Sequence, residues 1–335
     1  MTKKYYRKKH GRGFRYVDGN GKTVRDEKLK EWFRSLVIPP AWTDVEISGV
    51  KSADLLATGR DVKGRKQYIY HPDFVAHQNT QKFNRIVAFG EKLASMREVT
   101  EGHLRKREMS REKVLAAMVR LMDEVYLRPG HPRYTQENNS YGLTTLRSKH
   151  VEISGNEITF TYVGKSGQEQ EHHIRDARLA RIVRELDEMP GYRIFKYVDE
   201  NGKRHEVTHE DLNTYIRESM GDEFSCKDFR TWAGTLLAAK ALDDLEVDAE
   251  EEAKEQGDDD KKKESDIQAV VFTVAESLGN TPAIALSSYI DPRVLEMYRK
   301  GKTLVSYSKQ ANNKSEKSSN LLSVDEICLL CMSRS

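Results

Sequence analysis

The sequence has no long apolar run and few cysteines, and both shortages limit what the protein can be. No stretch of about 18 apolar residues occurs, so nothing predicts a membrane-spanning helix. The basic N-terminus, Met1 to Lys9, lacks the apolar segment of a secretory signal. Three cysteines argue against a disulfide scaffold and fit a reducing compartment. We therefore expect a cytoplasmic protein.

Motifs of several enzyme classes are also missing. Cys328 and Cys331 have CxxC spacing, but no second pair completes a zinc site, so we interpret them as buried packing residues of an apolar tail. Two Gly-Lys-Thr tripeptides, at 21–23 and 301–303, resemble the end of a phosphate-binding loop but lack its earlier glycine. HExxH and GxSxG are absent. These absences argue against ATP chemistry, zinc-protease chemistry and serine-hydrolase chemistry.

Charge is abundant and unevenly distributed. Charged residues make up 33% of the chain, and the net charge is +3. Residues 243–260 contain eleven acidic residues and one lysine, a local charge of −10, so the remainder of the chain carries +13. A surplus of this size suits a polyanionic partner, because neutralised phosphates release their counterions. A charged surface also keeps a protein soluble, and charge alone does not choose between the two interpretations.

The pattern of turns and apolar residues predicts an α+β protein in three segments. Residues 1–88 contain short alternating runs separated by Gly and Pro turns, which predict a small, mostly β domain. Residues 89–308 are mainly helical, and a small antiparallel sheet begins near Val151. Residues 309–335 are interpreted as a flexible linker and a tail with a short final helix.

An acidic, lysine-rich segment at residues 247–266 interrupts the helical part. It has no apolar face, so we expect a mobile loop. One hypothesis from its charge is an autoinhibitory flap that repels DNA or mimics it.

The segment from Gly59 to Tyr70 is a basic turn that runs into an alternating aromatic strand. Its candidate DNA-binding residues are Lys63, Arg65, Lys66, Gln67, Tyr68 and Tyr70. Cations, an amide and aromatic rings are the groups that meet phosphates and bases. The alternative is a solvated hairpin with both tyrosines packed beneath it.

Five short motifs occur in one order along the helical part. They are Arg128 at the end of a helix expected near 114–126, Lys165 at a hairpin tip, Lys227-Asp228-Phe229-Arg230-Thr231-Trp232, Leu278-Gly279-Asn280-Thr281-Pro282, and Ser288-Tyr289. Each motif alone is weak. Together, in this order, they resemble the type IB DNA topoisomerases, most closely the short poxvirus-like branch also found in bacteria. The resemblance covers roughly residues 36–305.

The resemblance implies a function and a set of partners. A monomer would clamp double-stranded DNA between the domain of residues 1–88 and a catalytic domain, residues 89–308, of the tyrosine recombinase and topoisomerase IB type. It would relax positive and negative supercoils by cutting one strand, forming a 3′-phosphotyrosyl intermediate and religating, without ATP, metal or another cofactor. Arg133 and Tyr134 match family positions at the DNA surface.

The chemistry explains why these residue types are needed together. Attack on a phosphodiester builds negative charge on the non-bridging oxygens, which Arg128 and Arg230 can grip with planar, always-charged donors. Tyr289 is the candidate nucleophile, and Lys165 is the candidate general acid for the departing 5′ oxygen. Asn280 stands where poxviral and nuclear enzymes carry histidine. Its amide can donate a hydrogen bond to a non-bridging oxygen, but it cannot change charge with pH.

Two alternatives compete with this interpretation. A tyrosine recombinase or integrase shares the fold and the nucleophile, but usually has a histidine where this chain has Lys227, together with a helical N-terminal domain. A non-catalytic DNA-binding protein would use the basic surface, but it would have no reason to keep the arginines, the lysine and the tyrosine as a set. A covalent DNA adduct that survives SDS would exclude the plain binder.

Overall fold

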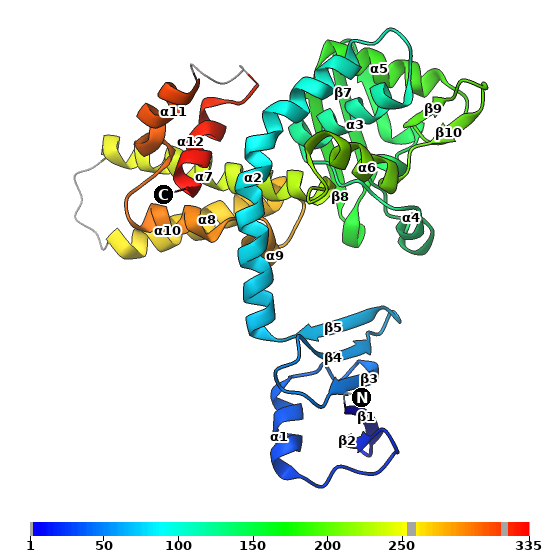
Figure 1. Cartoon of the computed structure of the whole chain (residues 1–335), viewed down its shortest axis with the longest axis vertical. Coiled ribbons are helices and arrows are strands. Elements are labelled where there is room, and N and C mark those ends of the chain that lie inside the picture. Colours follow the sequence, from blue (N-terminus) through cyan, green and yellow to red (C-terminus); the bar gives the residue numbers. More distant parts are fainter. Residues whose placement is uncertain (1–2, 253–258, 316–320, 335) are drawn as a thin grey trace. The chain divides into compact units, whose positions relative to one another are not determined.

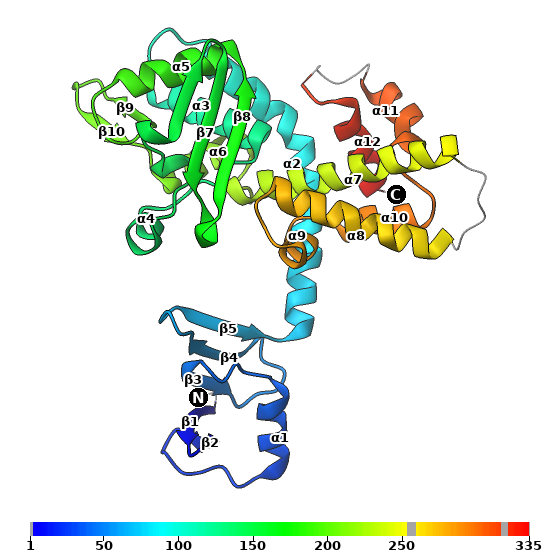
Figure 2. The same ribbon diagram turned by 180° about the vertical axis from the view of Figure 1, so that it is seen from behind.

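The computed structural model describes residues 3–252, 259–315 and 321–334. The chain divides into two compact units, Met1–Phe83 and Asn84–Ser335 (Figures 1 and 2). The division falls inside the long helix α2 (Pro72–Leu104), a few residues before the boundary expected at 88. Pro72 at the start of α2 and Asp73 in its first turn are ordinary helix-start signals. The helix therefore begins well before residue 89, where the sequence predicts the helical part of the chain.

The first unit is an antiparallel sheet with one helix. Its elements are β1 (Lys4–His10), β2 (Gly13–Asp18), α1 (Glu27–Ser35), β3 (Thr43–Ser48), β4 (Leu55–Arg60) and β5 (Lys66–Tyr70). The strand order is β2-β1-β3-β4-β5, which leaves β5 at an edge. Phe33 of α1 is the centre of the core, with its ring 5.1 Å from that of Tyr5 and 4.9 Å from that of Tyr16. The alternating runs predicted from the sequence correspond to β2, β3 and β5. Strand β1 was not predicted because its charges hide the alternation, and β4 and α1 were not predicted either.

The second unit is mainly helical and contains a three-stranded sheet and a two-stranded one. Its helices are the rest of α2, α3 (Arg111–Val125), α4 (Pro132–Asn138), α5 (Ala177–Glu188), α6 (His209–Met220), α7 (Cys226–Glu252), α8 (Asp259–Ser277), α9 (Pro282–Ser288), α10 (Pro292–Arg299), α11 (Ser308–Ser315) and α12 (Val324–Ser333). Its strands are β6 (Val151–Ser154), β7 (Glu157–Val163), β8 (Glu169–Arg175), β9 (Lys196–Val198) and β10 (Arg204–Glu206). The α+β class, with a small mostly β region and a larger helical domain, is confirmed.

Strands β6, β7 and β8 form a three-stranded sheet in that order, and the β7–β8 hairpin has its tip at one end of this sheet (Figure 2). Between β7 and β8 the chain turns through the short helix η3 (Lys165–Gly167), in which Ser166 and Gly167 have positive φ. Lys165 therefore lies at the tip of the hairpin, as the sequence predicted. Every second residue of β7 is buried, so these side chains lie on one face of the hairpin. This face packs against the helical core.

The prediction of a mobile loop at 247–266 is wrong for the residues that the structure describes. Helix α7 continues to Glu252, and α8 already begins at Asp259. The Ala and Glu residues that end α7 are good helix formers, so helix persists without an apolar face. In α8, Glu264 accepts a hydrogen bond of 2.5 Å from Arg299, and Asp266 accepts one of 2.8 Å from Tyr298. Within 247–266, only residues 253–258 lie outside the described ranges.

The tail is also more ordered than the flexible linker predicted from residue 309. Residues up to Ser315 belong to α11, and residues 316–320 lie outside the described ranges. The short final helix is confirmed as α12, and it packs against α7, α10 and α11. Cys328 and Cys331 are buried in the main core, as the packing interpretation required.

No single helix in the described part of the chain is long and apolar enough to cross a membrane. Helices α8 and α9 meet the length and composition limits only together, as a pair bent by 95°. Residues 3–252, 259–315 and 321–334 hold no cluster of three or more His, Cys, Asp or Glu side chains arranged to bind a metal.

Candidate active site

Side chains from five separate parts of the second unit meet near Tyr289. They are Arg128 just after α3, Lys165 at the tip of β7 and β8, Arg230 in the second turn of α7, Asn280 between α8 and α9, and Tyr289 at the end of α9. The sequence predicted all five as catalytic residues. The structure brings their charges close enough for Arg230, Arg128 and Lys165 all to affect the titration of Tyr289.

Arg128 is held by the turn that follows α8. Its Nη2 donates 2.7 Å hydrogen bonds to the carbonyl of Gly279 and to Oδ1 of Asn280. Asn280 in turn donates through Nδ2 to the carbonyl of Leu278, at 3.3 Å. These bonds use two of the five donors of the Arg128 guanidinium and leave the others for a ligand.

Arg230 is more deeply buried, and backbone carbonyls hold it as well. Nη1 donates to the carbonyl of Tyr126 at 2.5 Å, and Nη2 donates to that of Leu278 at 2.6 Å. The residue is only 4% exposed, and its Nε finds no hydrogen-bond partner among the described residues. A buried donor without a partner carries a desolvation cost, which a bound anion would remove.

The carbonyls hold both arginines without cancelling their charge. Among the described residues, no Asp or Glu oxygen lies within 4.0 Å of either guanidinium. The neighbouring carboxylate, Asp228, accepts hydrogen bonds instead from Arg85, at 3.1 Å, and from the Ser225 hydroxyl, at 2.9 Å. Burial and the charge of Arg230 lower the pKa of Arg128 to about 10. Two like charges in a poorly solvated place form a strong site for an oxyanion.

Tyr289 is placed by α7, the helix that also carries Arg230. Tyr289 is the C-cap of α9, and its carbonyl accepts a 3.1 Å hydrogen bond from the Thr235 hydroxyl. A Cβ atom on Gly234 would lie 2.8 Å from the same carbonyl, so only glycine permits this approach. Arg230 and Gly234 are four residues apart and share one face of α7. Cζ of Arg230 lies 5.2 Å from the centroid of the Tyr289 ring.

These cations make the phenol of Tyr289 more acidic. Burial alone would raise the pKa of Tyr289, but the charge and hydrogen bond of Arg230, followed by the charges of Arg128 and Lys165, lower it below its ordinary value of 10. A lower pKa means a larger phenolate fraction near neutral pH, and the phenolate is the nucleophilic form.

Gly279 shapes the turn that grips both arginines. Its φ of +57° lies in the left-handed region, where a helix commonly ends on glycine. A Cβ atom there would lie 2.6 Å from Oε1 of Gln170. The turn therefore needs glycine both for its conformation and for the close approach of β8.

Sequence reasoning missed three residues on the inner face of the hairpin. Tyr162 of β7 and Gln170 of β8 are paired in register, and His172 lies two residues farther along β8. The hydroxyl of Tyr162 lies 3.5 Å from Nε2 of His172. Burial, Arg230 and Arg128 lower the pKa of His172 to about 4, so the ring is neutral at pH 7. Strand alternation back from the buried Ile174 would have placed His172 and Gln170 on this face.

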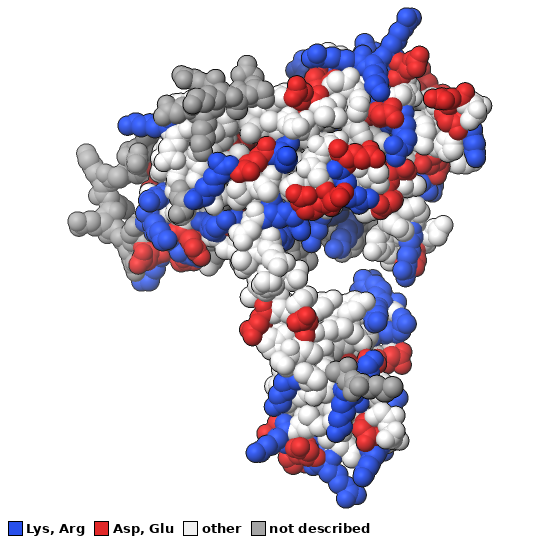
Figure 3. Space-filling view, viewed as in Figure 1, with Lys and Arg blue, Asp and Glu red and all other residues white. Residues whose placement is uncertain are grey.

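In the first unit, the predicted DNA-binding hairpin presents an exposed aromatic and basic face. Lys66, Tyr68 and Tyr70 alternate on the exposed side of β5, and the tyrosines are 46% and 43% exposed, with their rings stacked at 5.9 Å. They are therefore not packed beneath the hairpin. Lys63 is exposed in the turn between β4 and β5, where Lys and Arg gather in Figure 3.

Two members of the predicted set are engaged within the turn itself. Arg65 donates to Asp61 through Nε at 2.8 Å, and Gln67 donates to the same carboxylate through Nε2 at 2.9 Å. Strand alternation places Gln67 on the opposite face from Tyr68 and Tyr70. The structure thus separates Gln67 from the two tyrosines.

Arg133 and Tyr134 lie on the short helix α4 of the second unit. Both are exposed, Tyr134 at 57%, and Nε of Arg133 lies 2.7 Å from Oε1 of Glu137. Neither contacts Tyr289 in the described hydrogen bonds, ion pairs or ring contacts.

Two family models and several viral proteins match this chain. Residues 64–317 match the family model of the eukaryotic DNA topoisomerase I catalytic core, and residues 13–61 match that of the bacterial DNA topoisomerase IB N-terminal domain. The chain is similar to the DNA topoisomerase 1B of Acanthamoeba polyphaga mimivirus, 32% identical over 298 residues, which cover 88% of this chain and 87% of that protein. It is also similar to the DNA topoisomerase 1B of Vaccinia virus (strain Copenhagen), 25% identical over 82% of this chain and 83% of that protein.

The acidity of Tyr289 should depend on Arg230. Replacing Arg230 by Ala removes the strongest positive influence while the phenol stays partly buried, so the pKa of Tyr289 should rise. An ultraviolet difference titration of each protein against its Tyr289→Phe counterpart isolates this one of 15 tyrosines. Arg133→Ala, which removes an exposed arginine, should leave the titration unchanged. An unchanged or lower pKa of Tyr289 in Arg230→Ala would contradict this electrostatic account.

Proposed function

The chain belongs to the type IB DNA topoisomerases, and from this premise we propose that it relaxes positive and negative supercoils by reversible cleavage of one strand through Tyr289. The single observation that carries this proposal is the pair of carbonyl-held arginines near one tyrosine, whose pKa they lower. The arginines are Arg128 and Arg230, and both keep donors for a phosphate. Such a site suits attack by a phenol oxygen on a phosphodiester, because charge develops where the donors already lie.

Cleavage exchanges one phosphoester bond for another. The phenol of Tyr289 gives up its proton to solvent, and its oxygen attacks phosphorus, forming a P–O bond to the 3′ side of the strand. The bond from phosphorus to the 5′ oxygen breaks. Arg128 and Arg230 hold the two non-bridging oxygens, whose negative charge grows during the step. The buried Nε of Arg230 gains the partner that it lacks among the described residues.

Lys165 supplies the proton that the leaving oxygen needs. An alkoxide leaves poorly, so proton donation to the 5′ oxygen lowers the barrier. Lys165 is exposed at the hairpin tip, where it can approach DNA, and its charge acts on Tyr289. Religation reverses the sequence: the 5′ hydroxyl returns its proton to Lys165 and attacks phosphorus, and the phenolate of Tyr289 leaves. Each step replaces one phosphoester bond with another, so the chemistry requires no ATP.

Asn280 has two tasks in this scheme. Its Oδ1 orients Arg128 before DNA binds, and one N–H of its Nδ2 bonds to Leu278. Its second N–H is the donor for a non-bridging phosphate oxygen. Because an amide does not titrate near neutral pH, this contact adds no pH dependence to the cleavage rate.

The DNA contacts extend to both units of the chain. We propose that Lys63, Lys66, Tyr68 and Tyr70 contact the duplex from the first unit, and that Arg133 and Tyr134 contact it from the second. The proposed enzyme acts as a monomer on double-stranded DNA in the cytoplasm, at the nucleoid if the host is a bacterium.

Plasmid relaxation tests the nucleophile directly. With EDTA present and ATP absent, the wild type should relax both positive and negative supercoils and leave a DNA adduct that survives SDS. Tyr289→Phe lacks the attacking oxygen and should do neither. Tyr192→Phe, which alters a tyrosine that is 85% exposed, is the matched control and should relax at the wild-type rate. A wild type that binds the plasmid without relaxing it would overturn the proposed function.

A sulfur substitution tests the role of Lys165. When sulfur replaces the bridging 5′ oxygen, the thiolate leaves without a proton. On ordinary DNA, Lys165→Ala should slow cleavage by roughly 10²- to 10⁴-fold, the usual contribution of a general acid. On the sulfur substrate the same variant should approach the wild-type rate, whereas Arg128→Ala should stay slow on both. Equal slowing of Lys165→Ala on the two substrates would exclude the general-acid role.

The salt dependence of binding tests the hairpin. Each phosphate contact that is lost lowers the slope of log affinity against log salt by about 1. The double variant Lys63→Ala/Lys66→Ala should therefore bind duplex DNA more weakly, with a slope smaller by about 2. The control Lys8→Ala/Lys9→Ala removes the same charge from exposed residues of β1. If both variants changed the slope equally, the hairpin lysines would contribute no more to phosphate binding than those of β1.

A further inference from the structure

We propose that the C-terminal helix α12 is a positioning element of the active site, acting through Arg97 and Glu326 on the segments that hold Arg128 and Arg230. The inference rests on the proposed function, because it assigns the tail a part in the same cleavage step. It concerns a region, residues 321–334, that makes no contact with Tyr289 in the described hydrogen bonds, ion pairs or ring contacts.

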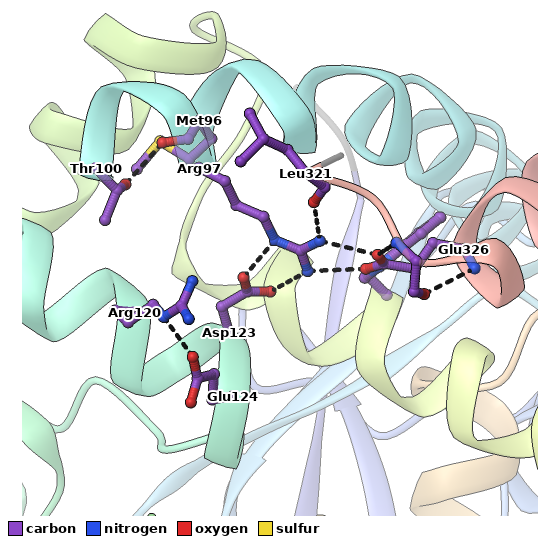
Figure 4. Close-up of polar contacts among 10 residues, drawn as sticks. Met96, Arg97, Thr100, Arg120, Asp123, Glu124, Leu321 and Glu326 are labelled. Atoms are coloured by element: carbon purple, nitrogen blue, oxygen red, sulfur yellow. Dashed lines mark hydrogen bonds and ion pairs between the residues drawn. The ribbon is translucent and has the colours of Figure 1, made fainter. Parts of the chain in front are cut away.

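Arg97 of α2 is the centre of a partly buried cluster of hydrogen-bonded side chains (Figure 4). Its Nε and Nη2 donate to the two oxygens of Asp123, at 2.7 and 3.1 Å. Nη1 and Nη2 donate to the two oxygens of Glu326, both at 2.8 Å. Nη1 also donates to the carbonyl of Leu321 at 2.7 Å. All five donors of the guanidinium are used, so α2, α3 and α12 are joined through one side chain.

Through α3 the cluster reaches the carbonyl that holds Arg230. Asp123 lies in the last turn of α3, and Tyr126 follows as its C-cap in the left-handed conformation, with φ of 58°. A residue other than glycine adopts this conformation only where its surroundings support it. The side chain of Tyr126 lines the same hollow as Arg97, Asp123 and Glu326. The carbonyl of this C-cap residue accepts the hydrogen bond from Nη1 of Arg230.

Arg128 belongs to the same stretch of backbone. It lies two residues after Tyr126, so the direction in which the chain leaves α3 also sets the position of the Arg128 guanidinium. Asp123 therefore anchors the helix end from which both the carbonyl and the second arginine project.

Through α7 the cluster reaches Arg230 from its own helix. Nε1 of Trp232 donates to Oε1 of Glu326 at 3.3 Å, and Trp232 lies two residues after Arg230. Trp232 is 3% exposed and lines the same hollow. Glu326 thus accepts hydrogen bonds from Trp232, which belongs to α7, and from Arg97, which also bonds to Asp123 at the end of α3. Helix α7 carries Arg230, and the residue after α3, Tyr126, supplies one of the two carbonyls that hold it.

Glu326 allows a clean substitution. It is the N3 residue of α12 and forms a capping box with Ser323, whose N–H donates to Oε2 at 2.8 Å. Gln is also accepted at this position of a capping box, so Glu326→Gln should keep α12 while it removes one carboxylate from Arg97. Burial alone would raise the pKa of Glu326, but Arg97 lowers it, so the wild-type side chain is charged at neutral pH.

The test is the rate of single-turnover cleavage with enzyme in excess over a duplex that carries one cleavage site. Glu326→Gln should form the covalent adduct about 10- to 100-fold more slowly than wild type, because a small displacement of a catalytic group costs this much. Its noncovalent affinity for DNA should stay within about twofold, since the DNA contacts are elsewhere. Asp325→Asn is the matched control: it removes a carboxylate from the same helix, at an exposed pair with Lys240. It should cleave at the wild-type rate.

A double-mutant cycle separates positioning from general destabilisation. Glu326→Gln should slow the Arg230→Ala enzyme less than it slows the wild type, because one of the two arginines through which Glu326 acts is then absent. An equal slowing in both backgrounds, or a Glu326→Gln rate equal to that of Asp325→Asn, would overturn the proposal. If Glu326→Gln fails to fold, Arg97→Lys replaces it, because it keeps the charge and loses the planar fork.

Hydrogen exchange distinguishes this inference from the proposed function. Amides of residues 124–130 should exchange at least about tenfold faster in Glu326→Gln than in Asp325→Asn. A wild type that forms no adduct would refute the proposed function, while the exchange result would still decide whether α12 holds this segment. Unchanged exchange there would overturn the positioning role even if the wild type cleaves DNA.

Discussion

Backbone carbonyls, rather than carboxylates, hold the two arginines beside Tyr289. The carbonyls of Tyr126, Leu278 and Gly279 fix the guanidiniums of Arg128 and Arg230 through dipoles and leave their net charge intact. The uncompensated charge lowers the pKa of the Tyr289 phenol and prepares a place for a phosphate. A carboxylate here would stabilise the free protein and weaken both effects. The glycine at the end of α8 and the left-handed Tyr126 serve this arrangement.

Arg97, unlike Arg128 and Arg230, has its charge balanced by carboxylates. Two carboxylates and a carbonyl satisfy all five of its donors, and Arg97 joins helices α2, α3 and α12. Losing one partner of such a cluster leaves charge buried and unbalanced, which makes the cluster sensitive to a single substitution. Arg97 lines the same hollow as Tyr126 and Trp232. The cluster of satisfied charges therefore lies next to the segments that carry and hold the two arginines whose charge is not balanced.

Local patterns predicted the elements well where the pattern is simple, and failed where charge hid it. The amphipathic spacing before Arg128 and the alternation of β7 predicted α3 and the hairpin that carries Lys165. The charged strand β1 was missed, because its lysines and arginines do not show which side chains are buried. The acidic stretch after Leu245 was interpreted as a loop, whereas α7 runs on to Glu252. A helical extension needs no apolar face of its own when it continues a helix that is already packed.

By itself, the sequence determined the family, the α+β class and five residues of the candidate site, but not the three on the inner face of the hairpin. Motif order and residue chemistry are properties of the chain alone, so they survive without coordinates. Only the tertiary structure decided which groups hold the arginines, that no described carboxylate accompanies them, and where the tail packs. These features depend on contacts such as that of Arg97 with Glu326, 229 residues apart in the chain. Periodicity reports which side of an element is buried, but not which distant atom it meets there.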